Sequence, residues 1–173
     1  MLKPLAMTRG VLDIKAPLIT SKEKITNPRR VDTRSPKPHR KAVFQMALYF
    51  KREFKYDSLQ YGYDGNETDE LHVAYLWIHP DFINFSDEFR VPCIGATCFR
   101  WRKWKDTPPG WAMQWIWLHP YFRRKGLLKA SWPKFKEEFP DFICESPLSE
   151  SMISFLKKMG PSKLEREKGD RLL

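Results

Sequence analysis

The sequence predicts a mixed α+β (α/β) domain, in which a mostly antiparallel sheet is flanked by helices and preceded by a basic N-terminal extension. Three observations predict this fold: an early apolar pattern at helical spacing, three β-branched and aromatic runs, and a final strand–helix–strand–helix succession. The 173 residues fit one domain, and the apolar share of 42% is enough for a packed core.

The first two elements follow from proline content and periodicity. Residues 1–37 carry scattered prolines and basic residues with few aromatics, so we expect an extension with one short strand at residues 10–14. Apolar residues at helical spacing, including Val43, Met46 and Phe50, then predict an amphipathic helix over residues 38–54. This helix opens a domain that we place at residues 38–160.

Residues 71–78, 93–101 and 111–118 are rich in β-branched and aromatic side chains and are bounded by turn residues, so each predicts a strand. A helix follows over residues 124–138, which Pro133 should kink or break.

The end of the domain is a short strand at residues 142–145 and a closing helix. Ser149 is the expected N-cap of that helix, which runs to Lys158 and is stopped by Gly160. Residues 161–173 are charged and are expected to form a tail.

The net charge of +10 lies entirely in the first third of the chain. Residues 1–55 hold 14 Lys and Arg against 4 Asp and Glu, whereas residues 56–173 hold 17 against 17. Such a segment can attract nucleic acid or an acidic protein face. A solubilising extension without a ligand is the equal alternative.

Cysteines and hydropathy indicate a cytoplasmic protein. The three cysteines are odd in number and lack CxxC spacing, and the histidines lack ligand spacing with them, so we expect a reducing compartment and no metal site. The sequence contains no apolar run of roughly 18 residues and no secretory leader, so we expect no membrane association. A monomer and a homodimer both remain open.

The most informative stretch joins the strand at residues 111–118 to the following helix. It contains His119 and Pro120, a basic turn with one glycine, and the start of a helix. The first N–H groups of a helix are unpaired and its dipole favours an anion, so this arrangement predicts a phosphate site.

The same stretch resembles the GNAT (GCN5-related N-acetyltransferase) family, whose motif has the form V-x-P-x-Y-R-x-x-G-x-G/A. Pro120, Arg123 and Gly126 match this pattern, whereas Leu128 stands where the family has Gly or Ala. The closing helix, with its Met-Gly ending, is similar to the family's last helix, and residues 143–150 show a short likeness to a turn of cohesin acetyltransferases.

The resemblance implies an acyltransferase that binds acetyl-coenzyme A between two splayed strands. An N–H near Trp117 or Leu118 would bind the acetyl oxygen, and the turn would hold the diphosphate. The expected cofactor-binding residues are Trp117, Leu118, Arg123, Arg124, Lys125, Gly126, Leu127 and Leu128. The implied acceptor is an amine, and the basic N-terminal third favours a protein or other macromolecule over a small metabolite.

Catalysis needs a base for the amine and a proton for the leaving thiolate. Glu145, at a strand end beside the expected splay, is the first candidate base, and His119 is the second. Leu156 replaces a tyrosine that many family members use as the proton donor, so Ser149 and Ser151 are the candidates for that role. A surface carboxylate, a turn histidine and a helix cap are the structural alternatives for these residues.

Two other functions remain open. A non-catalytic nucleic-acid-binding protein could use the basic N-terminal segment and the Trp-rich loop at residues 100–111, where cations alternate with aromatic residues. The same loop composition also suits a hairpin tip that covers a core. A degenerate GNAT fold with a binding role would agree with Leu128 and Leu156.

Overall fold

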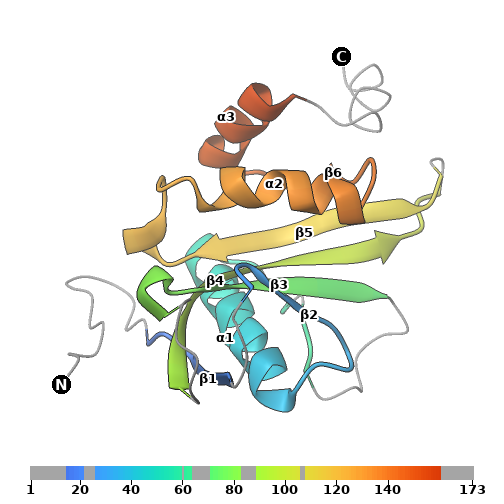
Figure 1. Cartoon of the computed structure of the whole chain (residues 1–173). Coiled ribbons are helices and arrows are strands. Elements are labelled where there is room, and N and C mark those ends of the chain that lie inside the picture. The colour runs from blue at the N-terminus through green and yellow to red at the C-terminus, as the bar shows by residue number, and fades with distance from the viewer. Residues whose placement is uncertain are drawn as a thin grey trace.

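The described residues form a six-stranded mixed sheet with helices on both faces (Figure 1). The computed structural model describes residues 15–21, 26–59, 61–63, 71–82, 89–105 and 108–160. The strand order is β2-β3-β4-β5-β6, with β1 paired to β4, and all pairs are antiparallel except β5 with β6. The strands are β1 Leu18–Ser21, β2 Arg29–Val31, β3 His72–Ile78, β4 Phe89–Arg102, β5 Gly110–Leu118 and β6 Ile143–Cys144. The predicted fold class is thereby confirmed.

Three helices cover the sheet. Helix α1 (Lys37–Phe54) lies on one face, whereas α2 (Leu127–Glu138) and α3 (Glu150–Met159) lie on the other (Figure 1). Two short 3-10 turns, η1 (Pro80–Phe82) and η2 (Pro120–Phe122), follow β3 and β5.

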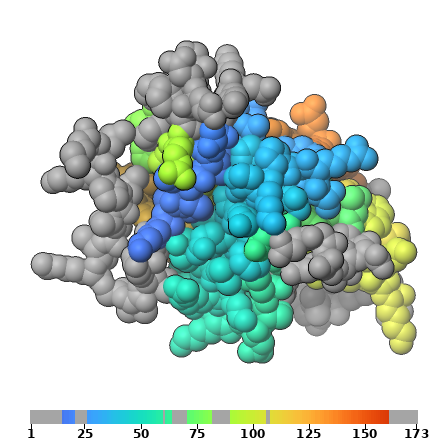
Figure 2. All heavy atoms as spheres, turned by 90° about the horizontal axis from the view of Figure 1, so that it is seen from below, coloured from blue at the N-terminus to red at the C-terminus, as the bar shows by residue number. Residues whose placement is uncertain are grey.

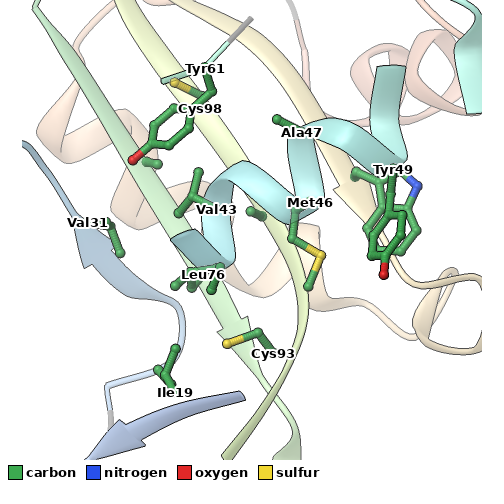
Figure 3. Packing of buried hydrophobic residues seen from close by; sticks show 14 of the residues in the cluster. Ile19, Val31, Val43, Met46, Ala47, Tyr49, Tyr61, Leu76, Cys93 and Cys98 are labelled. Atoms are coloured by element: carbon green, nitrogen blue, oxygen red, sulfur yellow. The ribbon is translucent and has the colours of Figure 1, made fainter. Parts of the chain in front are cut away.

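The core on the α1 face is built from the apolar stripe that the sequence predicts. Val43 and Met46 of α1 point toward the sheet near Leu76 and Cys93 (Figure 3). All four side chains are at most 1% exposed. Seen from below, α1 and β1 lie side by side over this face (Figure 2).

The core on the other face is aromatic. Phe135 of α2 lies with its ring centroid 4.9 Å from Tyr75 and 5.1 Å from Phe99, and Phe99 stacks on Phe139 at 4.3 Å. Aromatic rings bury large apolar areas and add a favourable edge or stacking geometry. This layer fixes α2 over β3 and β4.

Strands β1 and β2 lie in the segment that the sequence analysis treats as an extension. Arg29–Val31 pairs with β3, and Leu18–Ser21 pairs with residues 89–92 at the start of β4. Strand β1 has four residues and β2 has three. An alternation of apolar and polar residues over so short a run does not predict a strand. The strand expected at residues 10–14 and the tail at residues 161–173 lie outside the described residues.

Helix α2 begins three residues later than predicted and is not broken. Arg124 and Gly126 have φ angles of +60° and +80°, which a right-handed helix excludes, so the helix begins at Leu127. Pro133 lies inside a continuous helix, so of the kink or break expected there, the break does not occur. The predicted caps of α3 are confirmed: Ser149 accepts a hydrogen bond from the Met152 N–H, and Gly160, with φ +79°, ends the helix.

We expect Phe135→Ala to lower the free energy of unfolding by about 3–5 kcal/mol, because it leaves a cavity between α2 and the sheet. Urea denaturation followed by tryptophan fluorescence measures the change. The control is Leu71→Ala, at a side chain that is 59% exposed, which should change stability by less than about 0.5 kcal/mol. Equal losses in both variants would contradict this account of the core.

Candidate cofactor site at the end of strand β5

Strand β5 has one edge that β6 covers only in part. The parallel pairing joins Ala112 to Ile143 and Met113 to Cys144, and the Glu145 N–H then donates to the Met113 carbonyl oxygen at 3.0 Å. Beyond Met113, no strand among the described residues pairs with this edge, although β4 follows β5 to Leu118 on the other side. The two parallel strands therefore part midway along β5.

A β-bulge marks the place where they part. Cys98 of β4 lies opposite Trp115 and Phe99 lies opposite Met113, so Gln114 is an extra residue in β5. After the bulge, each side chain of β5 points to the face opposite to the one that strict alternation would give it. Met113 packs with the α2 and α3 layer, but Trp115, two residues later, packs under α1.

The direction of the β5 amides beyond the bulge follows from alternation. The His119 N–H donates to the Ile94 carbonyl oxygen at 2.8 Å, toward β4. Because successive N–H groups point to opposite edges of a strand, the amides of Leu118 and Ile116 face the edge that β6 leaves open, and that of Trp117 faces β4. Of the two expected amides, Leu118 is therefore the one on the open edge. Ile116, which the sequence analysis missed, could have been found by counting back two residues.

The turn after β5 leads into the start of α2. The first i to i−4 bond of the helix runs from the Ala130 N–H to the Gly126 carbonyl oxygen, at 2.9 Å. The N–H groups of residues 127–129 precede it, as in any helix N-terminus. A Cβ added at Gly126 would meet nothing within 4 Å, so the space beside this residue is open.

The three cations of the turn have different environments. Arg123 donates from both terminal nitrogens to Glu53 of α1, at 2.7 and 2.6 Å, and from Nε to the Leu118 carbonyl oxygen at 2.8 Å. Arg124 is exposed, and the Lys125 Nζ lies 3.6 Å from the Tyr121 ring centroid. The charge of Arg123 is thus balanced within the protein, whereas Arg124 and Lys125 remain at the surface.

Leu127 and Leu128 are half-buried and pack against the aromatic layer on the α2 face. The Leu128 side chain, which is larger than the Gly or Ala of the family motif, is therefore accommodated by packing against this layer.

His119 is buried next to this turn. Its side chain is 3% exposed, and its Nδ1 accepts a hydrogen bond from the Tyr121 N–H at 3.3 Å. The pKa of His119 lies below its ordinary value, because burial disfavours the charged ring and Arg123 lies nearby. Its surroundings match the turn histidine that the sequence analysis gave as the structural alternative.

Glu145 lies where β6 leaves β5. Arg102 of β4 holds its carboxylate from two nitrogens, at 2.6 and 3.1 Å, and the Glu145 side chain is 19% exposed. Tyr56, just after α1, donates to the Pro147 carbonyl oxygen at 3.3 Å, and its hydroxyl has a raised pKa because of burial and the nearby Glu145 charge.

The remaining predicted residues lie on α3 or beside it. Ser149 is occupied as the N-cap, and Ser151 is exposed in the first turn of the helix. Leu156 packs against the aromatic layer.

The Trp-rich hairpin between β4 and β5 packs on the core. The rings of Trp101 and Trp111 meet edge to face at 5.6 Å, and Trp111 lies 4.7 Å from Phe139. These contacts agree with a hairpin that covers a core.

Metal-binding groups do not gather in the part of the chain that the structure describes. No three His, Cys, Asp or Glu side chains are placed to hold an ion there. Cys93, Cys98 and Cys144 are all buried, and burial raises the pKa of the first two thiols to about 12. Within the same residues, every helix is too short or too polar to span a lipid bilayer.

Comparisons with known proteins find likenesses among solved structures. No family model matches the chain, and no curated protein matches it. Among solved structures, the chain is similar to an aminoglycoside acetyltransferase from an uncultured soil metagenomic sample, crystallised in complex with sisomicin. The TM-score is 0.45 and the sequence identity 10%, over 84% of this chain and 88% of that chain.

We expect the His119 ring to protonate below its ordinary pKa of 6.5. A folded-state pKa below the unfolded value stabilises the fold above pH 6.5, and this contribution is lost as the pH falls through the folded pKa. An NMR titration of the imidazole Hε1 signal measures the value, with the chain in urea as the unfolded reference. A folded midpoint at or above the reference would show that burial does not control this ring.

Proposed function

We propose that the chain is an N-acetyltransferase that binds acetyl-coenzyme A along the open edge of β5 and transfers the acetyl group to an amine by direct attack. The observation that carries this proposal is that the open-edge amides of β5, the basic turn and the start of α2 follow one another directly along the chain. The outward amides of Ile116 and Leu118 lead through a basic turn into the unpaired N–H groups that open α2. The GNAT-like motif in the same residues supports it.

The turn would hold the diphosphate of the coenzyme. The first amides of α2 and the helix dipole favour an anion, and the open space at Gly126 lets it approach the backbone. Arg124 and Lys125 would add positive charge at the surface. Leu127 and Leu128 would contribute their backbone amides, because their side chains pack inward.

One buried donor in the same layer would be a candidate partner for such a ligand. Trp132 of α2 is 3% exposed, and its Nε1–H has no hydrogen-bond partner among the described residues. Its ring lies 5.1 Å from Phe142 and 4.9 Å from Phe155, between α2 and α3. An unsatisfied buried donor costs about 1–3 kcal/mol, and an amide carbonyl of the pantetheine arm would satisfy it.

The proposed chemistry takes place at the open edge of β5. The coenzyme supplies a thioester, and the amides of Ile116 and Leu118 would stabilise the charge that develops on its carbonyl oxygen. Glu145 would accept the amine proton through a water. Ser149 and Ser151 are the candidates for protonating the sulfur, and His119 is the second candidate base, although its burial weighs against it.

The charge distribution along the chain bears on the acceptor. The excess of basic residues in the first 55 positions favours an acidic macromolecular acceptor or partner over a small metabolite. Nucleic-acid binding that weakens steeply with salt, without any response to the coenzyme, would favour the binding-protein alternative. Coenzyme binding without turnover on any amine would favour the degenerate fold.

We expect acetyl-coenzyme A to raise the melting temperature of the chain, as any ligand of the native state does. Arg124→Gln combined with Lys125→Gln should weaken the affinity roughly tenfold, equal to about 1.4 kcal/mol, by calorimetric titration. Lys157→Gln with Lys158→Gln, at the far end of α3, is the charge-matched control. The turn has no role in binding if both pairs bind alike, or if acetyl-pantetheine, which lacks the diphosphate, binds as tightly.

We expect Glu145→Gln to lower kcat at least roughly a hundredfold while the coenzyme dissociation constant stays unchanged, because the amide cannot accept the amine proton. Turnover is followed as free thiol released from acetyl-coenzyme A in the presence of a panel of small amines and acidic peptides. Glu137→Gln, at an exposed residue of α2, should retain full activity. Unchanged turnover of the Glu145 variant would remove this residue from the mechanism.

A further inference from the structure

Glu53 and Arg123 form a bridge between α1 and the turn after β5. The two residues are 70 positions apart, and the Glu53 carboxylate receives two hydrogen bonds from Arg123 and one from the Trp117 indole at 2.8 Å. Burial of this carboxylate opposes its ionisation, but the hydrogen bonds from Arg123 and Trp117 outweigh it, so the pKa of Glu53 lies below its ordinary value. Both side chains are only partly exposed, at 24% and 35%.

Arg123 connects this bridge to the backbone of β5. Its Nε donates to the Leu118 carbonyl oxygen, and its guanidinium lies 5.9 Å from the Trp117 ring. One planar side chain thus ties the last residue of the strand to α1, at the point where the chain turns toward α2. A bidentate pair of this kind fixes orientation as well as distance.

The turn that follows needs such a constraint. Arg124 has a φ of +60°, a conformation that side chains other than glycine rarely adopt and that the surrounding structure has to hold. Arg123 is the residue directly before it, and the start of α2 lies three residues further on. Loss of the bridge would free this connection to take other conformations.

We propose that Glu53 is a positioning residue that acts through Arg123 to hold the turn at residues 119–126, and with it the anion-binding start of α2. The ligand named below rests on the proposed function, whereas the positioning itself does not. In this arrangement Arg123 is a structural connector, and the cations that face the phosphates are Arg124 and Lys125.

The direction in which one substitution changes the affinity for coenzyme A distinguishes a positioning role from a simple charge effect. Glu53→Gln removes a negative charge close to the turn, so charge alone predicts tighter binding of coenzyme A, which is itself negative. Positioning predicts weaker binding. A purely structural carboxylate would lower overall stability and leave the affinity of the folded protein unchanged.

The experiment is a double-mutant cycle read by calorimetric titration of coenzyme A. We expect Glu53→Gln to weaken binding about tenfold, and the double variant with Arg123→Gln to bind no more weakly than Arg123→Gln alone. Asp57→Asn, which removes an exposed carboxylate just beyond α1, is the control and should bind like the unaltered chain. Equal or tighter binding by Glu53→Gln, or losses that add in the double variant, would overturn the proposal.

A second readout needs no ligand. Hydrogen exchange of a peptide that covers residues 119–126 should become faster in Glu53→Gln than in the unaltered chain, while a β3 peptide from the same digest exchanges alike in both. If coenzyme A does not bind even the unaltered chain, the proposed function fails, and faster exchange in the turn still supports the positioning role. Unchanged exchange in the turn overturns that role whatever the binding result.

Discussion

One extra residue in β5 organises the site. Without the bulge at Gln114, side chains would alternate without interruption along β5. Trp115 would then point with Met113 into the α2 layer. With it, Trp115 and Trp117 pack in the α1 layer, whereas Ile116 and Leu118 pack against the α2 layer. Its outward amides are presented beyond the last pair with β6.

At the end of β5, a series of contacts links α1 on one side of the sheet to the turn that leads into α2 on the other side. The ring of Tyr49 in α1 lies 5.1 Å from Trp117, and Trp117 donates to Glu53, which holds Arg123. The α1 face therefore supports a turn whose continuation packs on the opposite face. Such a link explains how a helix on one side of a sheet can fix the start of a helix on the other.

Much of the fold could be predicted from the sequence, because its long elements carry their own signals. The stripe containing Val43 and Met46 predicted α1 to within one residue at its start, and Ser149 and Gly160 marked the ends of α3. Strands β1 and β2 were not predictable, since a strand of three or four residues is defined by its partner. The site divides in the same way: the turn motif is local, whereas the pairing of Arg123 with Glu53 depends on tertiary structure.

The enclosed cysteines have a practical consequence. Cys93 and Cys98 lie under α1 and Cys144 lies under the opposite layer, all shielded from solvent. The thiolate is the form that reacts with alkylating reagents, and burial raises the pKa of the Cys93 and Cys98 thiols to about 12. Covered thiols of this kind will react when the surrounding layer opens. Each half of the core thus contains a natural chemical reporter of its own opening.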